Sequence, residues 1–337
     1  MSNSQKESNI RKVALTSLSG TSIEWYDFFL YGAAAGLVFP KLFFGEVDPT
    51  TALVLSFMTF AAGFIARPIG GIIFGHFGDL IGRKKTLVIA LMLMGISSTL
   101  IGLLPTYDTI GIVAPILLTT LRFCQGIAIG GQWGGAMLLV TESAPSDRRG
   151  YYGAYAQAGA PVGVILANIA FISVSMLTSE ENFLSWGWRI PFLISFVLVI
   201  ISMYIQLNLE DTKAFKDLEA MKSSDDSSPK VIKSSPILEA LRRYPKRISL
   251  AAGAFLSVQV TFYILVAFIL AYGVQTTDLS RNDLLMAVLI GSALMVPTQF
   301  MFSDYSDKNG RKGIFTVSYT HLRAHETLRY LVCRLLL

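Results

Sequence analysis

Eight long apolar runs constrain this sequence more than any other feature. A helix needs about 20 mostly apolar residues to cross the hydrocarbon core of a bilayer, and it pairs every backbone polar group internally. The runs therefore predict an all-α membrane protein with eight membrane helices in this chain. They cover residues 18–39, 52–75, 86–104, 110–142, 150–176, 187–208, 249–273 and 283–303.

The charged residues agree with this prediction. They make up 15% of the 337 residues, whereas soluble domains carry about 25%. The net charge of +5 comes from short basic clusters between the apolar runs. Such clusters orient a protein in the membrane, so we do not expect nucleic acid as a partner.

Basic residues mark every second connection between the runs. Lysine and arginine are enriched in the cytoplasmic loops of membrane proteins, so the pattern predicts a cytoplasmic N-terminus. The basic connections hold Arg11 and Lys12, Arg83 to Lys85, Arg148 and Arg149, Lys230 to Arg247, and Lys308 to Lys312. The acidic connections between them hold Glu46, Asp48, Asp108, Glu180, Glu181 and Asp278.

One long polar connection divides the chain after the sixth run. Its centre is rich in serine and aspartate, a composition typical of weakly ordered segments. We therefore predict an N-terminal six-helix bundle in residues 1–207, a cytoplasmic loop in 208–247 and the start of a second bundle in 248–316.

An internal repeat supports this division. Residues 75–85 follow the second run of the first half, and residues 303–313 follow the second run of the second half. Duplicated halves are typical of secondary transporters. In register, Asp79 matches Asp307, Gly82 matches Gly310, Arg83 matches Arg311, and Lys84 matches Lys312.

The first copy of the repeat, which includes Gly78, resembles the loop between helices 2 and 3 in the major facilitator superfamily. Residues 24–32, 64–71, 122–135 and 186–192 resemble the metabolite:proton symporter branch of that family. The resemblance extends over about residues 12–315. It implies a twelve-helix fold of two bundles, with solute bound between them near the middle of the membrane. In that fold the N-terminal bundle of this chain is complete, and the C-terminal bundle stops after about two helices.

The end of the chain does not read as a ninth membrane helix. Residues 317–337 resemble one reading frame of a transposase sequencing adapter. We therefore expect the native sequence to be interrupted near Thr316, and we expect the fragment itself to be inactive. The alternative is an unusual cytoplasmic tail. We assign no metal site to His321 and His325 of this segment, and the sequence predicts no cofactor.

Two carboxylates lie inside the first apolar run. Glu24 and Asp27 are three residues apart and therefore share one face of a helix. Ionisable groups at membrane depth are costly and rarely face lipid. We predict that the pair lines a central cavity and binds a proton or orients the solute. The alternative is a fixed structural ion pair.

Polar residues of the second and fourth runs are the candidate partners. Arg122 has the geometry to bind a carboxylate solute through two hydrogen bonds, or to pair with Asp27 and release it when a proton arrives. Gln125 lies one turn further on. The family usually has glutamate where this chain has Gln132; glutamine cannot titrate, although it can hydrogen-bond a solute. For Arg67, which precedes a proline, structural and functional roles remain open.

The first repeat is also the candidate cytoplasmic gate. The resemblance implies that Gly78, Asp79, Gly82, Arg83 and Lys84 stabilise one conformation through charge contacts with the neighbouring half. A carboxylate such as Asp79 is stabilised at a helix N-terminus by the helix dipole. The alternative is that the basic residues serve only to orient the chain.

These features together predict a secondary active transporter in the bacterial inner membrane. The expected function is proton-coupled symport of a small organic carboxylate or zwitterion by alternating access, with the protein monomeric in the lipid bilayer. The alternatives are an uncoupled facilitator and a membrane sensor that does not transport. An enzyme is not expected, because the chain before the tail has no metal-ligand cluster, activated nucleophile or cofactor motif.

Overall fold

The described part of the chain is helical and contains no β-strand. In this computed structural model, the described residues are 3–45, 47–81, 83–130, 140–141, 144–207, 242–311 and 313–314. Each of the eight apolar runs contains a helix, which confirms the predicted all-α fold. The elements are α1 (Asn3–Leu37), α2 (Phe39–Phe43), α3 (Pro49–Ile81), α4 (Arg83–Leu103), α5 (Tyr107–Ile110), α6 (Val113–Gly130), α8 (Arg149–Leu177), α9 (Glu180–Asn182), the π-helix η1 (Phe183–Gly187), α10 (Arg189–Leu207), α13 (Pro245–Tyr263), the π-helix η2 (Ile264–Phe268), α14 (Ile269–Thr276) and α15 (Arg281–Asn309).

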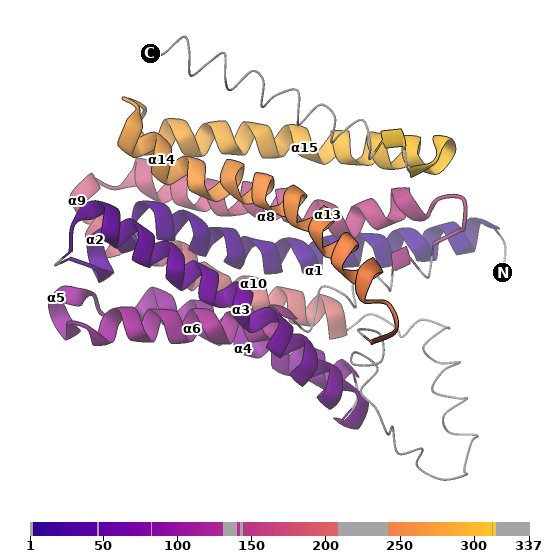
Figure 1. Cartoon of the computed structure of the whole chain (residues 1–337), viewed down its shortest axis with the longest axis horizontal. Coiled ribbons are helices and arrows are strands. Elements are labelled where there is room, and N and C mark those ends of the chain that lie inside the picture. Colours follow the sequence, from indigo (N-terminus) through magenta and orange to yellow (C-terminus); the bar gives the residue numbers. More distant parts are fainter. Residues whose placement is uncertain are drawn as a thin grey trace.

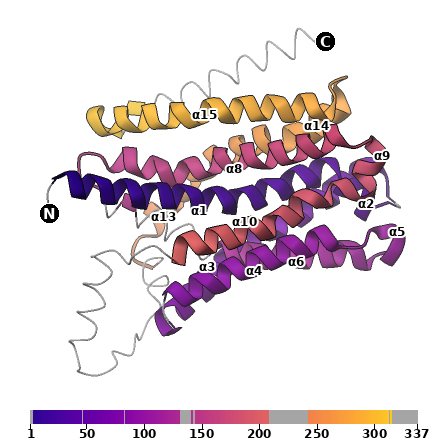
Figure 2. The ribbon, with the colours of Figure 1, turned by 180° about the vertical axis from the view of Figure 1, so that it is seen from behind.

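The long helices run side by side in an elongated bundle (Figure 1). Helix α15 lies on the outside against α8, and α8 packs in turn against α1. Helix α1 also contacts α3 and α10, while α4 and α6 pack behind them. The view from behind shows the same order of layers (Figure 2). Helix α1 is therefore central, which places its two carboxylates inside the bundle.

The connections separate by charge at the two ends of the bundle. The N-terminus, the start of α8, the start of α13 and the end of α15 share one end, called here the N-terminal end. Helices α2, α5 and α9 lie at the opposite end. The basic residues Arg11, Arg148, Arg247 and Lys308 are all exposed at the N-terminal end, so the alternation in the sequence becomes a charge difference between the two ends.

Several helices satisfy the length and composition of membrane spans. Five are residues 49–77 of α3, helix α6, helix α8, residues 259–276 across α13 to α14, and helix α15. Residues 180–187 and 189–204 form a sixth as a pair bent by 44°. Helix α4 has a shorter apolar stretch at residues 88–103. Helix α1 is less apolar because residues 3–12 are mostly polar and because Glu24 and Asp27 interrupt its apolar run. Both carboxylates are buried in the bundle.

Side-chain caps define where two helices begin at the opposite end. Asp48 accepts hydrogen bonds from the backbone N–H groups of Thr50 (3.1 Å) and Thr51 (3.0 Å) at the start of α3. Hydrogen bonds from Thr51 and Thr50 hold the pKa of the Asp48 carboxyl below its usual value. Ser280 and Asp283 form a capping box at the start of α15.

The backbones of α3 and α6 are in close contact. A Cβ atom added at Gly126 would collide with the carbonyl of Gly63, and one added at Gly130 would collide with the carbonyl of Arg67. Small residues four apart permit such close packing of membrane helices. The contact brings Arg67 of α3 close enough to Arg122 of α6 for the two charges to interact.

Replacing Gly130 by leucine is expected to force α3 and α6 apart. Overpacking costs about 1–3 kcal/mol even where side chains can adjust, and a backbone carbonyl cannot rotate away. We expect the thermal unfolding midpoint in detergent to fall by about 5 °C or more. Gly291→Leu is the matched control, because a Cβ atom at Gly291 meets nothing within 4 Å. Equal midpoints for the two variants would contradict the close contact.

The predicted domain boundaries are not addressed by this structure. Most of the connecting loop, residues 208–241, lies outside the described residues, as does the tail from residue 315 onward. The division at 207–208 and 247–248, and the assignment of residues 317–337 to a non-native tail, therefore stay predictions.

Candidate functional site

The two carboxylates of α1 belong to a buried group of four charged side chains. Glu24 is 4% exposed and Asp27 is 1% exposed. The cation that acts on Glu24 is Arg67 of α3, and the cation that acts on Asp27 is Arg122 of α6. We call Glu24, Asp27, Arg67 and Arg122 the charge cluster. Each carboxylate therefore has an arginine of its own, although both carboxylates come from one face of one helix.

Arg122 is only partly satisfied by hydrogen bonds. Its Nη1 donates to Oε1 of Gln125 (3.1 Å), and Nε2 of Gln125 donates to the hydroxyl of Ser98 on α4 (2.6 Å). The Nε and Nη2 groups of Arg122 are buried and have no hydrogen-bond partner among the described residues. The guanidinium, 1% exposed, thus keeps donors for an additional acceptor.

Asp27 lies close to polar groups without being fixed by them. Ser98, Ser195 and Arg122 are near enough to interact electrostatically with the carboxylate. Neither carboxylate oxygen makes a hydrogen bond of regular geometry within the described part of the chain. Among the described residues, the direct ion pairs all involve Arg281, Lys308 or Arg311, which lie at the ends of the bundle. The Asp27–Arg122 pair is therefore not a tight structural salt bridge.

Aromatic rings surround both guanidiniums. The ring centroid of Phe28 lies 4.3 Å from Cζ of Arg67 and 4.5 Å from Cζ of Arg122. Arg122 also lies 4.3 Å from the ring of Tyr31, and Arg67 lies 5.0 Å from the ring of Phe64. A desolvated cation over an aromatic face gains about 2 kcal/mol. The interactions with the rings thus offset part of the hydration free energy that the arginines lose on burial.

One residue of the second half reaches this site. Tyr263, at the end of α13, packs its ring against Phe64 (5.0 Å between centroids) and Phe28 (5.7 Å). Its hydroxyl is buried near Arg67 and makes no hydrogen bond of regular geometry among the described residues. The π-helix η2 begins at the next residue, and such turns are frequent at functional sites.

Sequence reasoning missed Phe28, Ser98, Ser195 and Tyr263 as parts of the site. All four are uncharged and lie in apolar runs, where aromatic and small polar residues are common. The one available signal was that Phe28 directly follows Asp27 in the stretch of α1 that resembles the symporter branch. Nothing local to Ser98, Ser195 or Tyr263 distinguishes them, since only packing brings them to α1.

Several predicted site residues cannot be placed. Gln132 lies outside the described residues, and so do Gly82 and Lys312. Gly78 and Asp79 belong to α3, and Arg83 and Lys84 begin α4, but their side chains are outside the described part. Their role in a gate stays a prediction.

The second copy of the repeat contacts the first half directly. Asp307, near the end of α15, accepts hydrogen bonds from the backbone N–H groups of Gly150 (2.9 Å) and Tyr151 (2.8 Å). These groups belong to the first turn of α8, where the helix dipole favours a carboxylate. Arg311 lies 3.9 Å from Asp307. Gly310 ends α15 with φ +85°, a conformation that glycine adopts at little cost.

A second contact joins the same helices at the opposite end. Arg281, at the start of α15, pairs with Glu180 of α9 at 2.7 Å. It also donates to the hydroxyl of Ser175 on α8 (3.0 Å), and its Cζ lies 4.1 Å from the ring of Phe183. Side-chain contacts made by Asp307 and Arg281 thus join both ends of helix α15 to the first half.

The described residues hold no group of three or more His, Cys, Asp and Glu side chains placed to bind a metal ion. The carboxylates of the charge cluster can exchange protons, and its guanidiniums can bind anions.

Comparison with known proteins identifies relatives along most of the chain. The sequence profile of the Major Facilitator Superfamily matches residues 17–322. The chain is 44% identical over 300 residues to the inner membrane metabolite transport protein YhjE of Escherichia coli, covering 87% of this chain and 66% of that protein. It is 42% identical over 315 residues to the shikimate transporter of Escherichia coli, with coverage of 91% and 69%. It is 35% identical over 306 residues to the proline/betaine transporter of Escherichia coli, with coverage of 88% and 60%.

The chain spans about two thirds of the length of the curated relatives it matches. Among solved structures, it resembles the xylose transporter XylE of Escherichia coli in a partially occluded inward-open conformation. That match has a TM-score of 0.65 at 16% identity and covers 90% of this chain and 74% of the transporter. A crystal structure of a D-xylose–proton symporter matches with a TM-score of 0.61 at 18% identity, covering 86% and 67%. At this identity the likeness concerns the fold alone.

Proposed function

The chain belongs to the major facilitator superfamily, and we propose on that premise that the protein is a proton-coupled symporter of a small organic carboxylate. It is a multi-pass membrane protein, as its apolar helices and its family indicate. In our proposal it lies in the bacterial inner membrane with its basic N-terminal end in the cytoplasm. Solute binds between the two halves and is released by alternating access.

The buried charge cluster is the observation that carries this proposal. An ionised group far from water is costly unless another charge balances it. With both acids ionised, the two carboxylates and two guanidiniums sum to zero. A proton on Asp27 leaves one positive charge in excess, and a bound carboxylate anion restores neutrality. The empty and the fully loaded states are then both neutral, whereas states that hold only the proton or only the anion are charged and disfavoured.

Asp27 and Arg122 are the residues that we assign to coupling. The Asp27 carboxylate oxygens lack hydrogen-bond partners among the described residues, and Arg122 keeps unpaired N–H donors. Proton binding at Asp27 weakens its attraction to Arg122, which frees the guanidinium for the solute. A planar guanidinium binds a carboxylate through two parallel hydrogen bonds, so Arg122 is suited to this exchange.

The charge balance also favours a carboxylate over a zwitterion. A zwitterion has no net charge and would leave the protonated cluster with one excess positive charge. The aromatic faces that could bind a quaternary ammonium group are already in contact with Arg67 and Arg122. Related proteins are named for shikimate, a carboxylate, and for proline and betaine, which are zwitterions. We therefore expect shikimate-like acids to be carried in preference to betaine.

Uptake by the full-length gene product in proteoliposomes tests the proposal. Shikimate, proline and betaine are offered with and without an inwardly directed proton gradient. We expect accumulation of the acid that depends on the pH gradient and is insensitive to an imposed membrane potential, since one proton and one monoanion carry no net charge. Uptake that only equilibrates would indicate an uncoupled facilitator, and binding without uptake would indicate a sensor. Both results would overturn the proposal.

We propose that the Asp307 contact holds the N-terminal end of the bundle closed. Asp307→Ala is expected to open it, because each hydrogen bond to a charged group is worth about 1.5–3 kcal/mol and two are lost. A shift of this size changes a two-state equilibrium by about tenfold or more. Spin labels at Asp147→Cys and Asn309→Cys, in a background without the native cysteines, should report a larger population of long distances. Asp304→Ala, which removes an exposed pair on the same helix, is the control and should leave the distances unchanged.

A further inference from the structure

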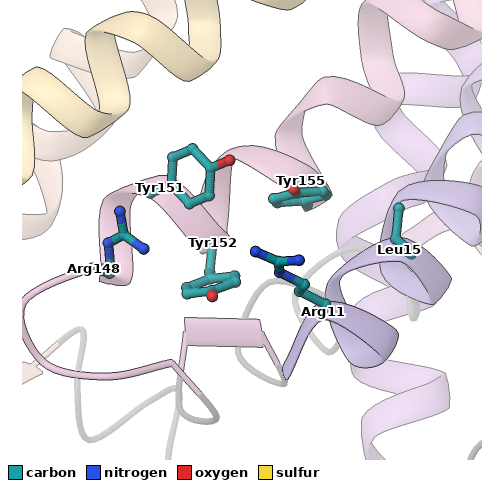
Figure 3. Close-up of a pocket in the computed structure, with 6 residues that line it drawn as sticks. All are labelled: Arg11, Leu15, Arg148, Tyr151, Tyr152 and Tyr155. Carbon is teal, nitrogen blue, oxygen red and sulfur yellow. The ribbon is translucent and has the colours of Figure 1, made fainter. Parts of the chain in front are cut away.

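A cavity of about 410 Å³ opens at the N-terminal end of the bundle, between α1 and the start of α8. Figure 3 shows the guanidinium of Arg11 on α1 and that of Arg148 before α8, with tyrosine rings in the space between them. The cavity is separate from the charge cluster, which lies in the middle of α1. Its lining residues are Arg11, Leu15, Arg148, Tyr151, Tyr152 and Tyr155.

The lining is cationic and unbalanced. Arg11 and Arg148 are both exposed, and neither forms an ion pair with any described residue. Among the described residues no acidic side chain lines the cavity, and the tyrosines add phenolic hydroxyls that can donate hydrogen bonds. Two guanidinium groups with hydroxyl donors between them suit a phosphate group, whose oxygens accept several charge-assisted hydrogen bonds.

The position of the cavity points to lipid as the source of that phosphate. Arg148 directly precedes α8, a predicted membrane span, and Arg11 lies one to two helical turns before the apolar run of α1. Tyrosine is enriched at membrane–water interfaces, and arginine is enriched in the cytoplasmic loops that adjoin them. Leu15 is 54% exposed at the rim and offers an apolar contact for an acyl chain. We propose that this cavity binds the phosphate of an anionic phospholipid.

Occupation of the site would reach the contact between the two halves. The backbone N–H of Tyr151 donates to Asp307, and the ring of Tyr155 packs 4.8 Å from that of Phe300 on α15. A phosphate bound to Arg148 and the tyrosines would restrict the motion of the first turn of α8. It would thereby keep the backbone N–H groups of that turn within hydrogen-bonding distance of Asp307. We therefore expect bound lipid to favour closure of the N-terminal end; this consequence, unlike the binding itself, rests on the proposed function.

Native mass spectrometry of the full-length protein with phosphatidylglycerol tests the binding without any transport assay. The double variant Arg11→Gln/Arg148→Gln should bind the lipid at least about 30-fold more weakly, since each guanidinium loses at least one charge-assisted hydrogen bond to the phosphate. The matched control is Arg242→Gln/Arg243→Gln, which removes two exposed arginines at the same end. It should change affinity by less than about threefold, because neither arginine lines the cavity and exposed charges outside a built site contribute little.

Three results would overturn the proposal. Equal losses in the two double variants would mean diffuse attraction to the surface and no site. Retention of phosphatidylcholine as strong as that of phosphatidylglycerol would show that the negative charge is not recognised. Displacement of the lipid by millimolar inorganic phosphate, with saturable phosphate binding in its absence, would assign the site to a free anion. Arg11→Lys/Arg148→Lys should give intermediate affinity, because it keeps the charge and loses the two-pronged geometry.

Discussion

Asp27→Asn is expected to abolish solute accumulation driven by a pH gradient while solute exchange across the membrane continues. The amide has nearly the same size and remains polar, but it cannot bind or release a proton. With one proton per carboxylate, a gradient of one pH unit supports at most about tenfold accumulation. The variant should reach no accumulation at all. Proteoliposomes with and without the gradient measure the first effect, and counterflow of labelled solute measures the second.

Two controls make this result specific. Asp27→Glu keeps a titratable group and should retain part of the accumulation, whereas Asp108→Asn changes an exposed carboxylate at the opposite end and should have no effect. If Asp27→Asn still accumulates solute against the gradient, the coupling role assigned to Asp27 is wrong. Glu24→Gln would then be the next variant to test, because Glu24 is the other buried carboxylate of α1.

Arg122→Gln is expected to abolish carboxylate transport and to destabilise the protein. Removing one member of a buried, directly paired salt bridge costs about 3–5 kcal/mol. A smaller loss is expected here, because Asp27 and Arg122 form no direct ion pair among the described residues. Here the uncompensated group would be Asp27. We expect a lower unfolding midpoint in detergent and no specific uptake above empty liposomes.

The double variant Asp27→Asn/Arg122→Gln separates the two effects. It removes both charges, so most of the lost stability should return while transport stays absent. Recovery of stability together with transport would contradict the role of Arg122 in binding solute. A double variant as unstable as Arg122→Gln alone would show that the two charges do not interact, and the proposed exchange between them would fail. Arg122→Lys keeps the charge without the planar fork and should bind the solute more weakly.

The helices were predictable because hydropathy is a local property. Each apolar run is long enough to satisfy the bilayer by itself, so its position along the chain required no knowledge of its neighbours. The same holds for Arg11, Arg148 and Lys308, which fall in connections and are exposed at one end of the bundle. Glu24, Asp27 and Arg122 could be singled out as candidates because a charge within an apolar run is costly wherever the run packs.

The partners of those charges could not be predicted in the same way. Glu24 and Asp27 share a helix face, yet they interact with different arginines on different helices. The repeat aligned Asp307 with Asp79, and the family resemblance implied contacts with the neighbouring half for the first copy alone. The sequence did not indicate the backbone N–H groups of α8 as partners of Asp307. Nothing in the sequence around Tyr263 indicates that its ring packs against Phe28 and Phe64.

By itself, the sequence determined the helical class, the number of apolar runs, the division of basic and acidic connections, and the residues whose burial needs an explanation. These properties follow from the free energy of transferring each segment into the membrane, which depends on that segment alone. Only the tertiary structure decided which arginine acts on which carboxylate, that Asp307 accepts hydrogen bonds from the first turn of α8, and that Arg11 and Arg148 line one cavity. Those pairings depend on close contacts between helices that are distant in the chain, such as the glycine contact of α3 with α6, and no single segment encodes them.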